Sequence, residues 1–221
     1  MNILVMGPQG SGKGTQAKRL ARKLDLAYFE AGDILREKAK EKTKLGKKIF
    51  RTIHQKGELV SDQIMEGIIK EWLSQKKPSQ GFLFDGFPRN QPQYQFVEKI
   101  LAEKKMKIDV AICLKITRET AIKRLSARRI CSECDREYNL VTLPPKNDQL
   151  CDQCQIELKQ RHDDSPKVIK KRLQIYDQLT SPLVDLFRQQ GILEEVDGER
   201  PVEVIFQDIL GRLGQVESVA K

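Results

Sequence analysis

The chain has 221 residues and a formal net charge of +9, which is enough for one large domain or for a core with inserted subdomains. Its longest apolar runs, such as residues 3–6 and 110–114, are far shorter than the roughly 20 residues that cross a bilayer, and this excludes a membrane-spanning helix. The positive charge is compatible with nucleic acid, a membrane surface or a substrate with several phosphates, and does not choose among them.

Short β-rich runs alternate with helical patterns along the chain. The runs cover residues 2–6, 27–29, 81–85, 109–114 and 192–196. This alternation predicts an α/β fold in which helices flank a parallel sheet of five strands.

The first helix is expected after the first strand and a glycine-rich loop. Ala17, Leu20, Ala21 and Leu24 follow the spacing i, i+3, i+4 and i+7, so they share one apolar helix face. Two later helices are expected at Ser-Pro pairs, residues 165–166 and 181–182, because serine caps a helix and proline suits its first turn.

The glycine-rich loop reads Gly-Pro-Gln-Gly-Ser-Gly-Lys-Gly-Thr over residues 7–15. Glycines let backbone N–H groups curl around an anion, the helix N-terminus adds positive potential, and Lys13 can reach the outer phosphates. A glycine loop alone would be a weak signal, but strand, lysine and helix together predict a nucleotide-binding cradle. Unlike the general pattern, Gly14 follows the lysine in place of serine or threonine.

Four cysteines have the spacing of a zinc site with two knuckles. Cys131 and Cys134 form one pair, Cys151 and Cys154 the other, and sixteen residues separate the pairs. Four thiolates leave no position for a catalytic water, so the zinc would be structural. Unliganded thiols or a redox pair are the alternatives. Cys113, in the fourth expected strand, is interpreted as a small buried apolar residue.

Four more segments carry a resemblance to a known family. They read Ala-Gly-Asp-Ile-Leu-Arg (31–36), Gly-Glu-Leu-Val-Ser-Asp (57–62), Asp-Gly-Phe-Pro-Arg (85–89) and Arg-His-Asp-Asp (161–164). With the Gly-Lys-Gly-Thr end of the loop, they resemble, in order, the monophosphate-binding and lid segments of the adenylate kinases, over nearly the whole chain. The resemblance implies the P-loop nucleoside monophosphate kinase fold in its long-lid, zinc-bearing form. It also implies reversible transfer of the γ-phosphoryl group of Mg-ATP to AMP, giving two ADP.

The resemblance further implies how the chain is divided. Residues 1–29, 61–126 and 165–221 would form the core, residues 30–60 an inserted AMP-binding segment, and residues 127–164 a zinc-binding lid. Both inserted parts would move, because a kinase of this type must exclude water before it reacts.

Six basic side chains are implied to carry the reaction. Two polyanions must approach each other, and arginine grips phosphate with two parallel hydrogen bonds. The six are Lys13, Arg89, Arg124, Arg128, Arg161 and Arg172. Arg124 and Arg128 are four residues apart and are expected on one face of a helix. No general base is needed, because the acceptor phosphate is largely ionised at neutral pH.

The same resemblance assigns two nucleotide sites. For ATP it implies Gly10, Ser11, Gly12, Lys13, Gly14, Thr15, Arg128, Glu137, Tyr138 and Arg200. For AMP it implies Ala31, Arg36, Glu58, Leu59, Val60, Gly86, Phe87, Pro88, Arg89, Gln93, Arg161 and Arg172. Asp85 would orient Mg²⁺ through bound water, or else be a structural carboxylate that caps the next turn.

The choice of base depends on two residues. Adenylate kinases usually have threonine where this chain has Ala31, and alanine resembles the uridylate-cytidylate kinases. Gln93 favours adenine, because its amide is long enough to read that base, and the long lid favours AMP too. We therefore predict an AMP kinase, with a UMP/CMP kinase of the same fold as the alternative.

A rival of another class is a zinc-ribbon P-loop ATPase that acts on nucleic acid. It leaves residues 85–89 and the arginines between 124 and 172 unexplained, and Tyr138 is the one aromatic residue of the lid sequence. We expect ATP, AMP and ADP as partners, no nucleic acid or membrane, and a monomer. A cytoplasmic location is expected, because the N-terminus lacks a basic region followed by a long apolar stretch.

Overall fold

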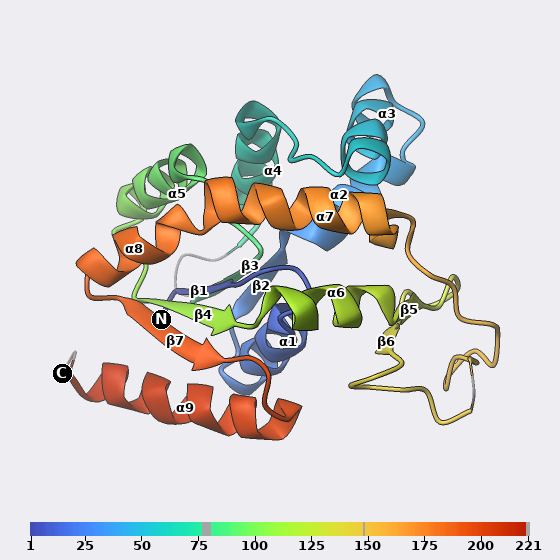
Figure 1. The fold of residues 1–221 in the computed structure, drawn as a ribbon. Coiled ribbons are helices and arrows are strands. Elements are labelled where there is room, and N and C mark those ends of the chain that lie inside the picture. The colour runs from blue at the N-terminus through green and yellow to red at the C-terminus, as the bar shows by residue number, and fades with distance from the viewer. Residues whose placement is uncertain (77–80, 148, 220–221) are drawn as a thin grey trace.

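The computed structural model describes residues 1–76, 81–147 and 149–219. Its centre is a five-stranded parallel sheet in the order β2-β3-β1-β4-β7, which confirms the fold expected from the sequence (Figure 1). The strands are β1 (Ile3–Met6), β2 (Ala27–Glu30), β3 (Phe82–Asp85), β4 (Val110–Lys115) and β7 (Leu193–Asp197). Residues 77–80, 148 and 220–221 belong to the expected core and lid ranges but lie outside the described residues.

Helices cover both faces of the sheet (Figure 1). They are α1 (Lys13–Lys23), α2 (Ala31–Lys40), α3 (Lys44–Phe50), α4 (Asp62–Ser74), α5 (Gln91–Glu103), α6 (Arg118–Ser126), α7 (Pro166–Ile175), α8 (Pro182–Gln189) and α9 (Val202–Val219). Three short segments complete the set: the π-helical η1 (Arg51–Lys56) and η3 (Tyr176–Thr180), and the 3-10 turn η2 (His162–Asp164). Among the described residues, no helix is both long and apolar enough to span a bilayer.

The core has two layers because side chains alternate along each strand. Ile3 and Val5 of β1 face a cluster built with α1 and α9, and Leu4 and Met6 face a cluster built with α4, α5 and α8. In α1 the expected apolar face is confirmed, since its buried residues include Ala17, Leu20 and Ala21. Parallel strands buried on both faces explain the uninterrupted apolar runs of the sequence.

The sheet topology brings the motif loops to one edge. The loop after β1 leads into α1, and the loop after β3 begins at Gly86. Because β1 and β3 are parallel neighbours, with Val5 paired to Asp85, both loops leave the same edge of the sheet. Ligands of open α/β sheets bind at this carboxyl edge.

The segment between α6 and α7 is an insertion with little regular structure. It contains one small antiparallel pair, β5 (Arg128–Ile130) and β6 (Glu137–Asn139), at the right of Figure 1. The expectation that Arg124 and Arg128 share a helix face is wrong. Helix α6 ends at Ser126, and Arg128 pairs with Asn139 as the first residue of β5, so strand pairing within the insertion overrides the helical spacing.

Both helices predicted at Ser-Pro pairs begin at the proline, with Ser165 and Ser181 at the N-cap positions, but the predicted capping by the two serine hydroxyls is wrong. Within the described chain neither Ser165 nor Ser181 makes a side-chain capping bond. Ser181 is itself helical, with φ −56° and ψ −37°, because α7, η3 and α8 follow one another without an extended residue. The π-helical η3 precedes Pro182, and such segments are a common site of helix bending.

Candidate nucleotide-binding and metal site

The loop over residues 7–15 lies close to the backbone of other segments of the protein. Two of its positions require glycine for this reason. Gly10 has φ +84°, and a Cβ at this position would lie 3.0 Å from the carbonyl oxygen of Ala121. Gly7 has φ +142°, and its Cβ would lie 2.5 Å from the carbonyl oxygen of Leu114. The loop therefore keeps a backbone-lined concavity at the start of α1, where N–H groups favour anions.

Lys13 is the first residue of α1, and its ammonium lies over this loop. Its Nζ donates to the carbonyl oxygen of Pro8 at 3.3 Å. Burial lowers the pKa of Lys13 to about 8, and the charge of Asp85 opposes this shift only in part. A bound phosphate would favour the charged form.

A cavity of about 540 Å³ extends from this loop to the insertion between α6 and α7 and to the loop before α9. All ten residues that were expected to bind ATP line this cavity: Gly10, Ser11, Gly12, Lys13, Gly14, Thr15, Arg128, Glu137, Tyr138 and Arg200. Arg124 lines it as well and donates to the carbonyl oxygens of Gly10 at 3.4 Å and Gly198 at 2.8 Å. The structure thus brings Arg124 and Arg128 to one cavity from different elements.

Asp85 lies at the end of β3, under the loop. Its Oδ2 accepts a hydrogen bond from the Tyr28 hydroxyl at 3.0 Å and would be 3.3 Å from a Cβ on Gly14. Its Oδ1 is buried and has no partner among the described residues. Gly86, the next residue, donates its N–H to the Val5 carbonyl oxygen of the neighbouring strand β1 at 3.3 Å. An unpartnered buried carboxylate oxygen beside a phosphate cradle fits a water-bound cation better than a turn cap.

Two adjacent aspartates hold three of the expected arginines. Arg172 contacts Asp163 at 2.9 Å and Asp164 at 3.1 Å. Arg128 donates to both oxygens of Asp164, and Arg161 to both oxygens of Asp163. Burial would raise the pKa of Asp163, but the charges of Arg172 and Arg161 outweigh it and hold this pKa below its ordinary value. The guanidinium groups are therefore kept in place by paired, buried carboxylates.

A second, narrow cavity lies between the loop after β3 and the segment from α2 to α4. Eight of the residues expected for AMP line it: Ala31, Glu58, Leu59, Val60, Gly86, Phe87, Arg89 and Gln93. An adjoining space is lined by Arg36, Arg89 and Arg172. Among the described residues, Pro88 and Arg161 are outside both linings. Pro88 follows a cis peptide bond in the same loop.

The side chains of this second cavity are fixed by neighbours. Arg89 Nε donates to the Gly86 carbonyl oxygen at 2.7 Å, and its own carbonyl oxygen accepts from Thr180 Oγ1 at 2.7 Å. Arg36 forms ion pairs with Asp33 and, at 3.5 Å, with Glu30. These contacts keep two guanidinium groups beside the space where a monophosphate would lie.

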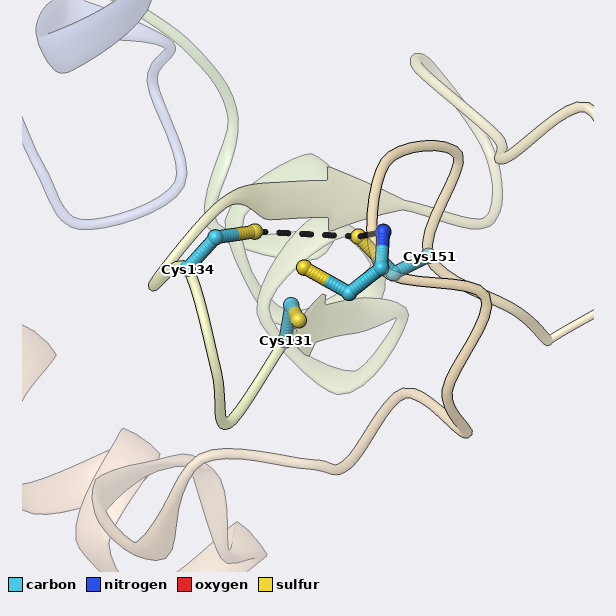
Figure 2. A group of neighbouring side chains, drawn as sticks. Cys131, Cys134 and Cys151 are labelled. Carbon is cyan, nitrogen blue, oxygen red and sulfur yellow. Dashed lines mark hydrogen bonds between the residues drawn. The ribbon is translucent and has the colours of Figure 1, made fainter.

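The four cysteines of the insertion converge (Figure 2). Their sulfur atoms all lie within 4.8 Å of one another, with Cys134 Sγ 3.7 Å from Cys151 Sγ. Tetrahedral zinc with Zn–S bonds of about 2.3 Å requires sulfur atoms about 3.8 Å apart. The donor set and its size therefore fit a structural zinc ion. The fifth cysteine, Cys113, is buried in β4 as expected, and burial raises its pKa to about 11.

The cysteine cluster is connected to the cavity of about 540 Å³ through Tyr138, which lines it. The Tyr138 hydroxyl lies 3.4 Å from Cys151 Sγ and accepts the Asp152 N–H at 2.9 Å. Cys131, Tyr138, Cys151 and Leu158 form the small buried cluster of the lid. A metal bound by the cysteines would therefore hold Tyr138 in its place in the cavity lining.

Several residues of the site were missed by sequence reasoning. Asp163 and Asp164 lie in the Arg-His-Asp-Asp segment, but no role was predicted for them. Asp62 ends the quoted segment 57–62 and Thr180 lies in none of the quoted segments; neither was assigned a role, because their contacts are with residues 28 or more positions away. A search for carboxylates that could neutralise the charge of the arginines could have found Asp163 and Asp164, but it would not have found the roles of Asp62 and Thr180.

Comparison with known proteins gives one consistent result. A family model described as adenylate kinase matches residues 5–192. An adenylate kinase of Archaeoglobus fulgidus is 41% identical over 218 residues, which are 99% of this chain and 100% of the relative. One of Methanothrix thermoacetophila is 42% identical over 95% of this chain and 96% of the relative. One of Caldanaerobacter subterraneus subsp. tengcongensis is 38% identical over 95% and 94%.

Proposed function

The chain belongs to the adenylate kinase family, and on this premise we propose that it transfers the γ-phosphoryl group of Mg-ATP reversibly to AMP, giving two ADP. One observation carries the proposal: two cavities adjoin the arginine cluster, one lined by the phosphate loop and the other by Arg89 and Gln93. The relatives are named adenylate kinases, which favours AMP over the UMP/CMP alternative and gives no support to a nucleic-acid ATPase.

On the ATP side, the loop N–H groups and Lys13 would bind the β- and γ-phosphates, while Arg124 and Arg128 approach from α6 and β5. Mg²⁺ arriving with ATP would neutralise phosphate charge. Asp85 would orient that ion through bound water, and its unpartnered buried Oδ1 supports this role. The lining by Tyr138 and Arg200 supports an adenosine position between lid and core.

On the AMP side, Arg36 and Arg89 would hold the phosphate and Gln93 the base. Ala31, Val60 and Phe87 add an apolar lining. The narrow cavity encloses only about 20 Å³, which supports a movement of the segment of residues 30–60 when AMP enters. This supports the division into a core, an AMP-binding segment and a lid.

Transfer would depend on positioning and charge, since the acceptor phosphate is already ionised. Arg128 uses two of its five N–H donors on Asp164, so other donors can take phosphate oxygens. Arg161 and Arg172 are oriented by Asp163 in the same way. Preorganised guanidinium groups stabilise developing charge without reorganisation during the reaction.

The lid and the AMP-binding segment would close over the site together. Lys40 of α2 lies 3.4 Å from Asp135, which follows the first cysteine pair. Closure of the two inserted parts over the site would exclude water, the competing acceptor. A structural zinc ion at the four cysteines, a monomeric state and a cytoplasmic location belong to the same proposal.

The test is a coupled assay that offers AMP, CMP, UMP or GMP with Mg-ATP. We expect AMP to be the best acceptor by at least about tenfold in kcat/KM. Transfer to CMP or UMP well above AMP would overturn the substrate assignment. Strongly salt-dependent binding of a polynucleotide, with no transfer to any monophosphate, would favour the nucleic-acid ATPase instead.

A further inference from the structure

The side chain of Gln93 is held in one orientation by two groups that differ in hydrogen-bonding character. Gln93 is 2% exposed. Its Oε1 accepts the backbone N–H of Arg89 at 2.9 Å, and its Nε2 donates to Oδ1 of Asp62 at 2.8 Å. A backbone N–H can only donate and a carboxylate can only accept, so a flipped amide would lose both bonds.

Asp62 is itself fixed by the start of α5. Asn90, the N-cap of that helix, donates from Nδ2 to the same Asp62 oxygen at 2.9 Å and accepts the backbone N–H of Gln93 at 2.9 Å. Asp62, Asn90 and Gln93 thus form a closed ring of hydrogen bonds. Asp62 is also the first residue of α4, where a negative charge is favourable.

From this ring we infer that Asp62 is a positioning residue for base selection: it fixes which face of the Gln93 amide meets the base. This inference deepens the proposed function and rests on it. Asp62 itself is outside the lining of the AMP-side cavity among the described residues, so it acts through Gln93.

The fixed amide has a definite chemical preference. After the bonds to Arg89 and Asp62, Gln93 retains one acceptor position on Oε1 and one N–H on Nε2. Adenine offers an amino N–H at position 6 beside an acceptor at N1, which matches that pair. A 6-oxopurine offers an acceptor beside an N–H and would need the flipped amide. Ala31 supplies no hydroxyl here, which leaves more of the discrimination to Gln93.

The experiment compares AMP with inosine monophosphate, which differs at that edge of the base, in two variants of the full chain. Asp62→Ala removes the acceptor, and Asp62→Asn removes the charge but keeps an oxygen for Gln93 and Asn90. For Asp62→Ala we expect the AMP-to-inosine monophosphate ratio of kcat/KM to fall about tenfold, because one buried hydrogen bond no longer opposes the flip. KM for AMP should rise and KM for ATP should stay within about twofold.

Asp62→Asn should keep the wild-type ratio within about threefold. A ratio unchanged in Asp62→Ala, or equal losses in both variants, would overturn the inference and leave the proposed function standing. A wild-type chain that does not prefer AMP would overturn the proposed function, and the inference with it.

A stability measurement covers the case in which Asp62→Ala fails to fold. Gln93→Glu places two carboxyl groups in contact at Asp62 and should lower Tm. In the double variant, Asp62→Asn supplies an amide N–H to the new carboxylate of Gln93→Glu. It should restore part of the lost Tm, because substitutions at two contacting residues are not additive. A double variant no more stable than Gln93→Glu would also overturn the inference.

Discussion

Arg128 donates two hydrogen bonds to the fully buried carboxylate of Asp164, from Nε at 2.7 Å and from Nη2 at 2.6 Å. Arg128 begins β5, the first strand of the lid, and Asp164 ends η2, where the chain returns to the core. Arg172 of α7 adds a third bond to this carboxylate at 3.1 Å. One side chain therefore ties both ends of the lid to the core.

Removing this carboxylate should destabilise the fold strongly. Asp164→Ala leaves Arg128 without its buried partner and Arg172 with Asp163 alone, and we expect a loss of about 3 kcal/mol in unfolding free energy. Asp177→Ala is the matched control, because its ion pair with Arg118 at 3.0 Å is half-exposed and should contribute at most about 1 kcal/mol. Urea unfolding of both variants measures the difference, and equal losses would contradict the structural role of Asp164.

Removing Arg89 should abolish most turnover without unfolding the chain. Arg89→Ala deletes the guanidinium that lies beside both the AMP-side cavity and Arg172, and we expect kcat to fall at least about a hundredfold. Arg118→Ala, on the exposed surface of α6, should keep wild-type kinetics. Steady-state rates and Tm are measured together; near-normal kinetics for Arg89→Ala would refute its assignment.

The affinity for ATP should fall as pH rises through about 8. Burial holds the pKa of Lys13 at about 8, so its ammonium is charged below this pH and neutral above it. ATP keeps its phosphate charge throughout, since the last phosphate pKa is about 6. The pH profile of kcat/KM for Mg-ATP, at saturating AMP, reports the groups of the enzyme–AMP complex before ATP binds.

Lys13→Arg is the control for that profile. A guanidinium stays charged above pH 12, so the variant, although slower, should show no decline between about pH 7 and pH 9.5. A wild-type profile that is flat over the same interval would show that Lys13 does not titrate there.

Much of the fold could be predicted because its signals are local. Short β-rich runs marked all five strands of the sheet, and the glycines of residues 7–15 were meaningful because a strand precedes them and a helix follows. The cysteine spacing likewise needed no tertiary information, and the sulfur atoms do converge.

The remainder depends on contacts between distant segments. Asp164 meets Arg128 across 36 positions, and Asp62 meets Gln93 across 31. No periodicity encodes such pairs. The error at Arg128 has the same origin, since pairing with Asn139 decides that this residue leaves the helix, and strand formation depends on such context.

Zinc should be required by the lid and not by the core. Protein purified without chelator should contain about one zinc per chain. Cys131→Ser should lose it with a lower Tm, because the small buried cluster of the described lid residues is built around the cysteines themselves. Cys113→Ala is the control, since Cys113 packs in the core cluster with Met6 and Phe84 and should leave the zinc content unchanged. Elemental analysis that finds no zinc in the wild type would contradict the site.

Restoring a hydroxyl at position 31 should improve AMP binding. Ala31 begins α2, is 1% exposed and lines the AMP-side cavity, where the adenylate kinases usually carry threonine. Ala31→Thr should lower KM for AMP about threefold, since a neutral hydrogen bond contributes about 0.5–1.5 kcal/mol net. Ala31→Val adds the same volume without a hydroxyl, so it isolates the hydrogen bond from the cost of a larger side chain. If both variants change KM for AMP equally, the hydroxyl has no effect here, and base selection depends on Gln93 and its anchor at Asp62.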